Sequence, residues 1–145
     1  MKLRDLGLYL AWLVAIVATA GSLYLSEVRH FVPCTLCWYQ RIMMYPLVIL
    51  LGIASFRNDR GIIAYTLPMS LLGLATATYH VLEQNIPGFG APQLCQLGIP
   101  CSVKYINWLG FISIPVMSLT AFTLISLFLI LAIGRNKLPV ETKLA

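Results

Sequence analysis

Residues 6–25 read LGLYLAWLVAIVATAGSLYL, a run of twenty residues without a charged side chain. An α-helix rises about 1.5 Å per residue, so a helix of this length crosses the roughly 30 Å hydrocarbon core of a bilayer. The basic flank of Lys2 and Arg4 and the Ala-Thr-Ala sequence at 18–20 would also suit a cleavable signal peptide. Because the apolar run continues to Leu25, we expect a retained membrane span.

Three further apolar runs, at about residues 38–56, 62–82 and 108–133, have similar lengths. The chain has 145 residues, of which 59% are hydrophobic and 10% charged. It is too apolar for a water-soluble domain and too short for several domains. We therefore predict an all-α membrane protein, a four-helix transmembrane bundle that forms a single domain over residues 1–145.

The basic residues predict how the bundle lies in the membrane. Cytoplasmic segments of membrane proteins carry the excess of lysine and arginine. This rule places both termini in the cytoplasm and two outer loops at about residues 26–37 and 83–107, in a multi-pass protein of the plasma membrane. The net charge of +5 is not gathered on one basic face, so we expect no nucleic-acid partner. The residues on the predicted inner side are Lys2, Arg4, Arg57, Arg60, Arg135, Lys137 and Lys143, against chiefly Arg29, Arg41 and Lys104 outside.

The sequence PCTLCWYQR, at residues 33–41, places two thiols and a cation at the start of the second span. The free N–H groups of a helix N-terminus stabilise a thiolate, the form of cysteine that attacks disulfides. Cys37 and Arg41 are four residues apart and therefore share a helix face. Arg41 either extends to the outer headgroups or acts as a fixed positive charge beside the Cys37 thiolate and an electron acceptor.

The four cysteines, Cys34, Cys37, Cys95 and Cys101, all fall in or beside the predicted outer loops, on the extracytoplasmic, oxidising side. Proximity favours the disulfides Cys34–Cys37 and Cys95–Cys101 among the three possible pairings. Purely structural disulfides and buried, unreactive thiols are the alternatives. A zinc site built from four thiolates is a weaker alternative given the CxxC and CxxxxxC spacings, so we expect no metal.

His80 lies near the outer end of the third predicted span, level in depth with the CxxC sequence. It either donates a hydrogen bond or a proton to a bound acceptor or has a structural role. Glu83 and Gln84 are interpreted as ordinary helix-end residues.

Several segments together resemble one known family. The segments CTLCWYQR at 34–41, YHVLEQ at 79–84 and WLGFISIPVMSL at 108–119, with the Cys95 and Cys101 pair, resemble the DsbB family of disulfide-generating membrane proteins. The resemblance covers nearly the whole chain and is greatest to the shorter, BdbC-like branch. It implies an oxidoreductase that reoxidises an extracytoplasmic, thioredoxin-like thiol oxidase of the DsbA type and passes the electrons to a membrane quinone, menaquinone or ubiquinone.

The resemblance also implies roles for individual residues. Cys95 would be attacked by the partner, and Cys101 would resolve the mixed disulfide by exchange with Cys34. Cys37 would then give its electrons to the quinone. By the same resemblance, the side chains that flank the quinone head group beside Cys37 would be Arg41 and His80.

One feature departs from the family, because only residues 96–100 separate Cys95 from Cys101, whereas many members have a long segment there. The exchange with Cys34 must therefore work over a shorter reach. Two other functions stay open on the residues alone. One is a quinone or epoxide reductase like vitamin K epoxide reductase, although that family carries its CxxC at the last helix. The other is a non-enzymatic four-helix membrane protein with structural disulfides.

Overall fold

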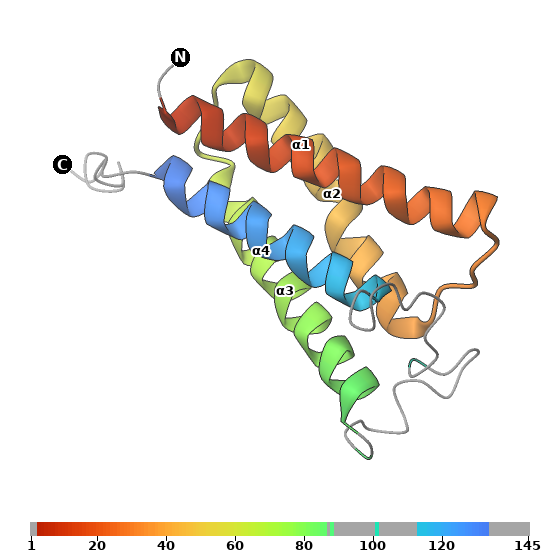
Figure 1. The fold of residues 1–145 in the computed structure, drawn as a ribbon. Coiled ribbons are helices and arrows are strands. Elements are labelled where there is room, and N and C mark those ends of the chain that lie inside the picture. The colour runs from red at the N-terminus through yellow and green to blue at the C-terminus, as the bar shows by residue number, and fades with distance from the viewer. Residues whose placement is uncertain (1–2, 87, 89–100, 102–112, 134–145) are drawn as a thin grey trace.

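The computed structural model describes residues 3–86, 88, 101 and 113–133, and these residues form four α-helices and one π-helical turn without any strand (Figure 1). Most of the predicted outer loop at 83–107, including Cys95, lies outside the described residues. The elements are α1 (Leu3–Leu23), the π-helix η1 (Tyr24–Val28), α2 (Thr35–Arg57), α3 (Ile63–Asn85) and α4 (Ile114–Ile133).

The helices form an up-and-down bundle. α1 packs against α2 and α4, and α3 packs against the same two helices from the other side. The N-terminal end of α1 and the C-terminal end of α4 lie at one end of the bundle, and the start of α2 lies at the opposite end (Figure 1). The predicted four-helix bundle is thus confirmed, while its orientation in a membrane stays a prediction.

Within the described part of the chain, three segments are long and apolar enough to cross a membrane: Leu6–Val28, Thr35–Arg57 and Ile114–Ile133. α3, which covers the third predicted span, is not among them by length and composition, and it contains polar side chains such as Ser70 and His80, which are buried inside the bundle. Many large apolar side chains point outward instead of into the core, as expected for a surface that faces lipid. Examples are Val17, Ile49, Phe56, Tyr65 and Ile130, of which Phe56 and Tyr65 are more than 70% exposed.

Small residues allow the helices to approach closely. Ala11 and Ala15 of α1 are completely buried. On α3, Gly73 faces the Phe122 ring of α4 so closely that a Cβ atom at Gly73 would overlap that ring. Close backbone approach of this kind is typical of helix pairs in membranes, where van der Waals packing drives association.

The first outer connection is shorter than the predicted loop at 26–37. The π-helix η1 carries the first helical segment on to Val28, and α2 begins at Thr35 instead of residue 38. Cys34 occupies the N-cap position of α2, where its sulfur accepts a hydrogen bond from the Cys37 N–H at 3.4 Å. The Cys34 side chain thus caps α2, a role that the CxxC spacing alone does not indicate.

The fourth helix begins later than the predicted span at 108–133. Ser113 is not helical, α4 begins at Ile114, and residues 108–112 lie outside the described part of the chain. Pro115 therefore occupies the first turn of α4, where a residue without an N–H group costs the helix no hydrogen bond.

Candidate active site

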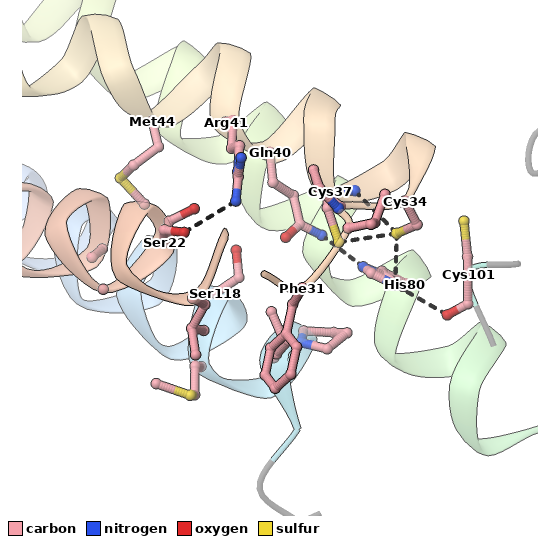
Figure 2. Close-up of a pocket in the computed structure, with 18 of the residues that line it drawn as sticks. Ser22, Phe31, Cys34, Cys37, Gln40, Arg41, Met44, His80, Cys101 and Ser118 are labelled. Atoms are coloured by element: carbon pink, nitrogen blue, oxygen red, sulfur yellow. Dashed lines mark hydrogen bonds between the residues drawn. The ribbon is translucent and has the colours of Figure 1, made fainter. Parts of the chain in front are cut away.

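Cys34 and Cys37 are both free thiols in the structure, with their sulfur atoms 2.9 Å apart (Figure 2). Cys34 is buried at the start of α2, and Cys37 is half-buried one turn further along the same helix. The pair is therefore described in its reduced form, and the Cys34–Cys37 disulfide stays a prediction for the oxidised form.

Hydrogen bonding from Cys37 lowers the pKa of the Cys34 thiol to about 4, against an ordinary value of 9.0. Burial acts in the opposite direction, and a further lowering comes from His80. Cys34 lies just outside the membrane-spanning segment Thr35–Arg57. A thiol with this pKa is almost fully ionised at neutral pH and is ready for thiol-disulfide exchange.

His80 lies near the C-terminal end of α3 and is 1% exposed. Its Nε2 atom lies 3.7 Å from the Cys34 sulfur and 3.3 Å from the carbonyl oxygen of Cys101. Its Nδ1 atom lies 3.2 Å from the side-chain nitrogen of Gln40, which is also buried. Figure 2 shows the imidazole between α2 and Cys101. His80 thus directly contacts the thiol pair.

Cys101 packs with Cys34 and Leu36 in one buried cluster. It is disulfide-bonded, and its partner lies outside the described residues, so the Cys95–Cys101 pairing stays a prediction. The side-chain N–H of Gln84 donates to the Cys101 carbonyl at 3.2 Å, beside the contact from His80. The interpretation of Gln84 as an ordinary helix-end residue is therefore wrong, because its side chain bonds the backbone of Cys101.

Arg41 extends from α2 toward α1. Its Nη2 group donates to the carbonyl oxygen of Ser22 in α1 at 3.1 Å (Figure 2). Its guanidinium also lies 5.5 Å from the centre of the Trp38 ring, within the range of a cation–π contact. Ser22 lies just before the π-helix η1, a local widening of the helix that is frequent at functional sites. The fixed-charge alternative for Arg41 is favoured by this geometry.

These groups line one largely apolar pocket. Its wall contains residues from all four helices, α1 to α4. Among the predicted site residues, Cys34, Cys37, Arg41, His80 and Cys101 line it, whereas Cys95 lies outside the described residues. Five further polar residues line the pocket although the sequence did not indicate them as site residues, namely Ser22, Gln40, Tyr45, Gln84 and Ser118. Only the spacing of Gln40 and Tyr45 from Cys37, three and eight residues on one helix, could have indicated them.

Two buried polar atoms at this pocket, Nε of Arg41 and the hydroxyl of Tyr45, have no hydrogen-bond partner in the part of the chain that the structure describes. The two residues are four apart on α2, so they lie on the same face of the helix, one turn apart. Buried polar groups in proteins are nearly always hydrogen-bonded. An oxygen-bearing ligand in the pocket would satisfy both donors.

Comparison with known proteins identifies the family. Residues 4–132 match a family model described as "Disulfide bond formation protein DsbB". The chain belongs to the DsbB family. It is 53% identical over 136 residues to disulfide bond formation protein C of Bacillus subtilis (strain 168), covering 94% of this chain and 99% of that protein.

Other relatives have similar names. A probable disulfide formation protein of Coxiella burnetii (strain RSA 493 / Nine Mile phase I) is 50% identical over 131 residues, which cover 90% of this chain and 89% of that protein. Probable disulfide formation protein C 1 of Bacillus anthracis is 43% identical over 125 residues, which cover 86% of this chain and 90% of that protein. No solved structure matches the chain.

Membership of the DsbB family has a direct consequence for function. The chain is a membrane oxidoreductase of disulfide bond formation. This contradicts the interpretation as a non-enzymatic four-helix protein. It also agrees with a site in which a disulfide-bonded cysteine lies against a reactive thiol pair.

Proposed function

We propose that the protein generates disulfides by reoxidising an extracytoplasmic, DsbA-like thiol oxidase and passing the electrons to a membrane quinone. The observation that carries this proposal is that one apolar pocket is lined by Cys37 and by two donors, Nε of Arg41 and the Tyr45 hydroxyl, that have no partner among the described residues. Such a pocket suits a flat, lipid-soluble acceptor with carbonyl oxygens. The redox cysteines would then face the extracytoplasmic side.

The first step would take place at the loop cysteines. A thiolate of the reduced partner attacks the Cys95–Cys101 disulfide and forms a mixed disulfide with Cys95, which releases the Cys101 thiolate. The second partner thiol then displaces Cys95. The partner leaves with a new disulfide, and the loop pair has gained two electrons and two protons as a dithiol.

The second step would pass these electrons inward. Exchange between the loop dithiol and the Cys34–Cys37 disulfide restores the loop disulfide and leaves Cys34 and Cys37 as thiols. Burial of Cys34 and Cys101 in one cluster supports a short reach between the pairs. Stabilisation of the Cys34 thiolate makes this sulfur a good leaving group in the exchange.

The pocket fits a quinone on the chemistry of its donors. Arg41 and Tyr45 would donate hydrogen bonds to carbonyl oxygens, while apolar residues such as Val17, Met44 and Met117 would contact the ring and tail. Cys34 and Cys37 would give two electrons to a bound quinone when they return to a disulfide. Because Cys34 is already a thiolate, the Cys37 thiol would supply one of the two protons that the acceptor takes up, and water would supply the other. The protein's own contribution is to exclude water, hold the acceptor beside Cys37 and keep Cys34 ionised.

The proposal is tested with purified protein, a reduced DsbA-like partner and quinone. We expect one quinone to be reduced for each disulfide formed in the partner. Cys37→Ala should abolish quinone reduction, because no Cys34–Cys37 disulfide can form. Cys95→Ala should abolish it with the protein partner only, while a small dithiol that reaches Cys34 and Cys37 directly still drives the reaction.

Quinone turnover by the Cys37→Ala variant at the parental rate would overturn the proposal. Net flow of electrons from quinol to the partner under the same conditions would instead favour the reductase direction. Thiol counting on each variant before and after quinone is added checks that the cysteines are in the assumed redox states.

A further inference from the structure

We propose that the reduced protein binds a thiophilic metal ion such as Zn²⁺ through Cys34, Cys37 and His80. The two sulfur atoms and one imidazole nitrogen all lie within 4.8 Å of one another. Cys34 and His80 are buried, and Cys37 is half-buried. Two thiolates and one imidazole are a ligand set that suits zinc, with a fourth position left for water or another small ligand.

The distances require little movement for metal binding. With Zn–S and Zn–N bonds of about 2.3 and 2.0 Å, a tetrahedral ion holds its sulfur and nitrogen ligands about 3.6 Å apart and two sulfurs about 3.8 Å apart. The Cys34 sulfur already lies 3.7 Å from the Nε2 atom of His80. The two sulfurs, now 2.9 Å apart, would have to separate, which a small rotation of the half-buried Cys37 side chain allows.

Gln40 provides support behind the metal ligand. A metal-bound imidazole nitrogen leaves the proton on the other nitrogen, and that N–H group needs an acceptor. The Gln40 amide lies 3.2 Å from Nδ1 of His80. Because an amide carries both an oxygen and an NH₂ group, Gln40 can accept from Nδ1–H when metal is bound and donate to Nδ1 when it is absent. The Cys101 carbonyl, which loses its contact with His80 on metal binding, keeps its hydrogen bond from Gln84.

The chemistry of binding is a proton exchange without electron transfer. The metal forms two M–S bonds and one M–N bond, and any proton still held by the two thiols is released. No sulfur is oxidised or reduced. The ion and the Cys34–Cys37 disulfide are therefore mutually exclusive, so metal would bind the reduced protein only and would block its reoxidation. This inference depends on the geometry of the three ligands and not on the identity of the electron acceptor.

The experiment uses the full chain in detergent micelles, reduced with a phosphine, and Co²⁺ as the spectroscopic probe. We expect one Co²⁺ per chain, a thiolate-to-cobalt charge-transfer band, and loss of that band when Zn²⁺ is added in competition. Protein oxidised beforehand at Cys34 and Cys37 should show no band.

Variants identify the ligands. Cys37→Ser and His80→Asn should each lose the band or weaken binding by at least about tenfold, and Gln40→Leu should weaken binding by about tenfold through the supporting hydrogen bond. The matched control is His30→Asn, because His30 is exposed and has a positive φ of 54° that asparagine tolerates. Cys95→Ser should retain binding, which excludes a site made by the loop cysteines.

Three results would overturn the inference: no charge-transfer band in the reduced parent, unchanged affinity in His80→Asn, or equal binding by oxidised protein. Circular dichroism of each variant checks that it is folded. If His80→Asn does not fold, His80→Gln replaces it in the same measurement. Quinone reduction by metal-free protein is measured in parallel. If the protein reduces quinone normally but binds no metal, only this inference is refuted. If the protein binds metal but does not reduce quinone, only the proposed function is refuted.

Discussion

The Nε2 atom of His80 lies 3.7 Å from the sulfur of Cys34, although 46 residues separate the two in the chain. The contact joins the C-terminal end of α3 to the N-cap of α2. It places a buried imidazole beside a thiol whose pKa is lowered, and perturbed groups of this kind are concentrated at functional sites. His80 also contacts the Gln40 side chain through its Nδ1 atom and the Cys101 carbonyl oxygen through its Nε2 atom.

The reactivity of Cys34 should change with pH near pH 4, well below the range in which the reactivity of an ordinary thiol changes. Its pKa is lowered to about 4, so in the reduced protein the thiolate fraction rises as pH increases through 4 and is nearly constant above about pH 6. An ordinary thiol would continue to gain reactivity up to about pH 9. Alkylation of Cys34 by iodoacetamide, measured by mass spectrometry at each pH, tests this.

The Cys37→Ala variant provides the control for that titration. It removes the hydrogen bond that contributes most to the lowered pKa, so the midpoint for Cys34 should move to higher pH. A rate that still rises steeply between pH 7 and 9 in the parent protein would contradict the prediction.

Gln84→Leu should slow transfer between the two cysteine pairs. The substitution removes the hydrogen bond to the Cys101 carbonyl, which contributes about 0.5–1.5 kcal/mol and corresponds to a two- to tenfold decrease in the rate of partner-driven quinone reduction. Turnover driven by a small dithiol acting directly on Cys34 and Cys37 should stay unchanged. Asn85→Ala is the control, since Asn85 is exposed and bonds only within its own helix. Equal loss in both assays would argue against this role.

Tyr45→Phe should weaken quinone binding with little effect on the thiol steps. The variant removes only the hydroxyl that has no partner among the described residues, so we expect the KM for quinone to rise about two- to tenfold at similar kcat. Tyr39→Phe is the matched control on the same helix, because Tyr39 is exposed and does not line the pocket. Identical KM values for the two variants would exclude Tyr45 from the acceptor site.

Gly73→Ala should destabilise the bundle. The added methyl group would overlap the Phe122 ring of α4, and overpacking of this kind costs about 1–3 kcal/mol. Thermal unfolding followed by circular dichroism in detergent should show a lower midpoint. Gly21→Ala is the control, because a Cβ atom at Gly21 meets nothing within 4 Å. A midpoint equal to that of the parent would show that α3 and α4 separate more easily than the structure indicates.

Several parts of the site were predictable because they depend on local sequence. The CxxC sequence at a helix start and the spacing from Cys37 to Arg41 follow from helix periodicity, and the structure places both residues at one pocket. The contacts of Gln40 and Gln84 were not predictable, because their partners His80 and Cys101 lie 40 and 17 residues away. Helix spacing places Gln40 near Cys37, but no local pattern indicates that either glutamine contacts a residue so distant in the chain.

The sequence by itself determined the class of the protein: long uncharged runs can satisfy their backbone hydrogen bonds in a bilayer only as helices, and four cysteines in two pairs indicate redox chemistry. Only the tertiary structure decided which groups surround the reactive thiol. Packing of α3 against α2 and α4 fixes the depth of His80, and the close approach at Gly73 helps to set it. Such contacts depend on how each helix is rotated and at what angle the helices cross. The apolar pattern of a membrane helix does not determine either, because its lipid-facing and core-facing sides are both hydrophobic.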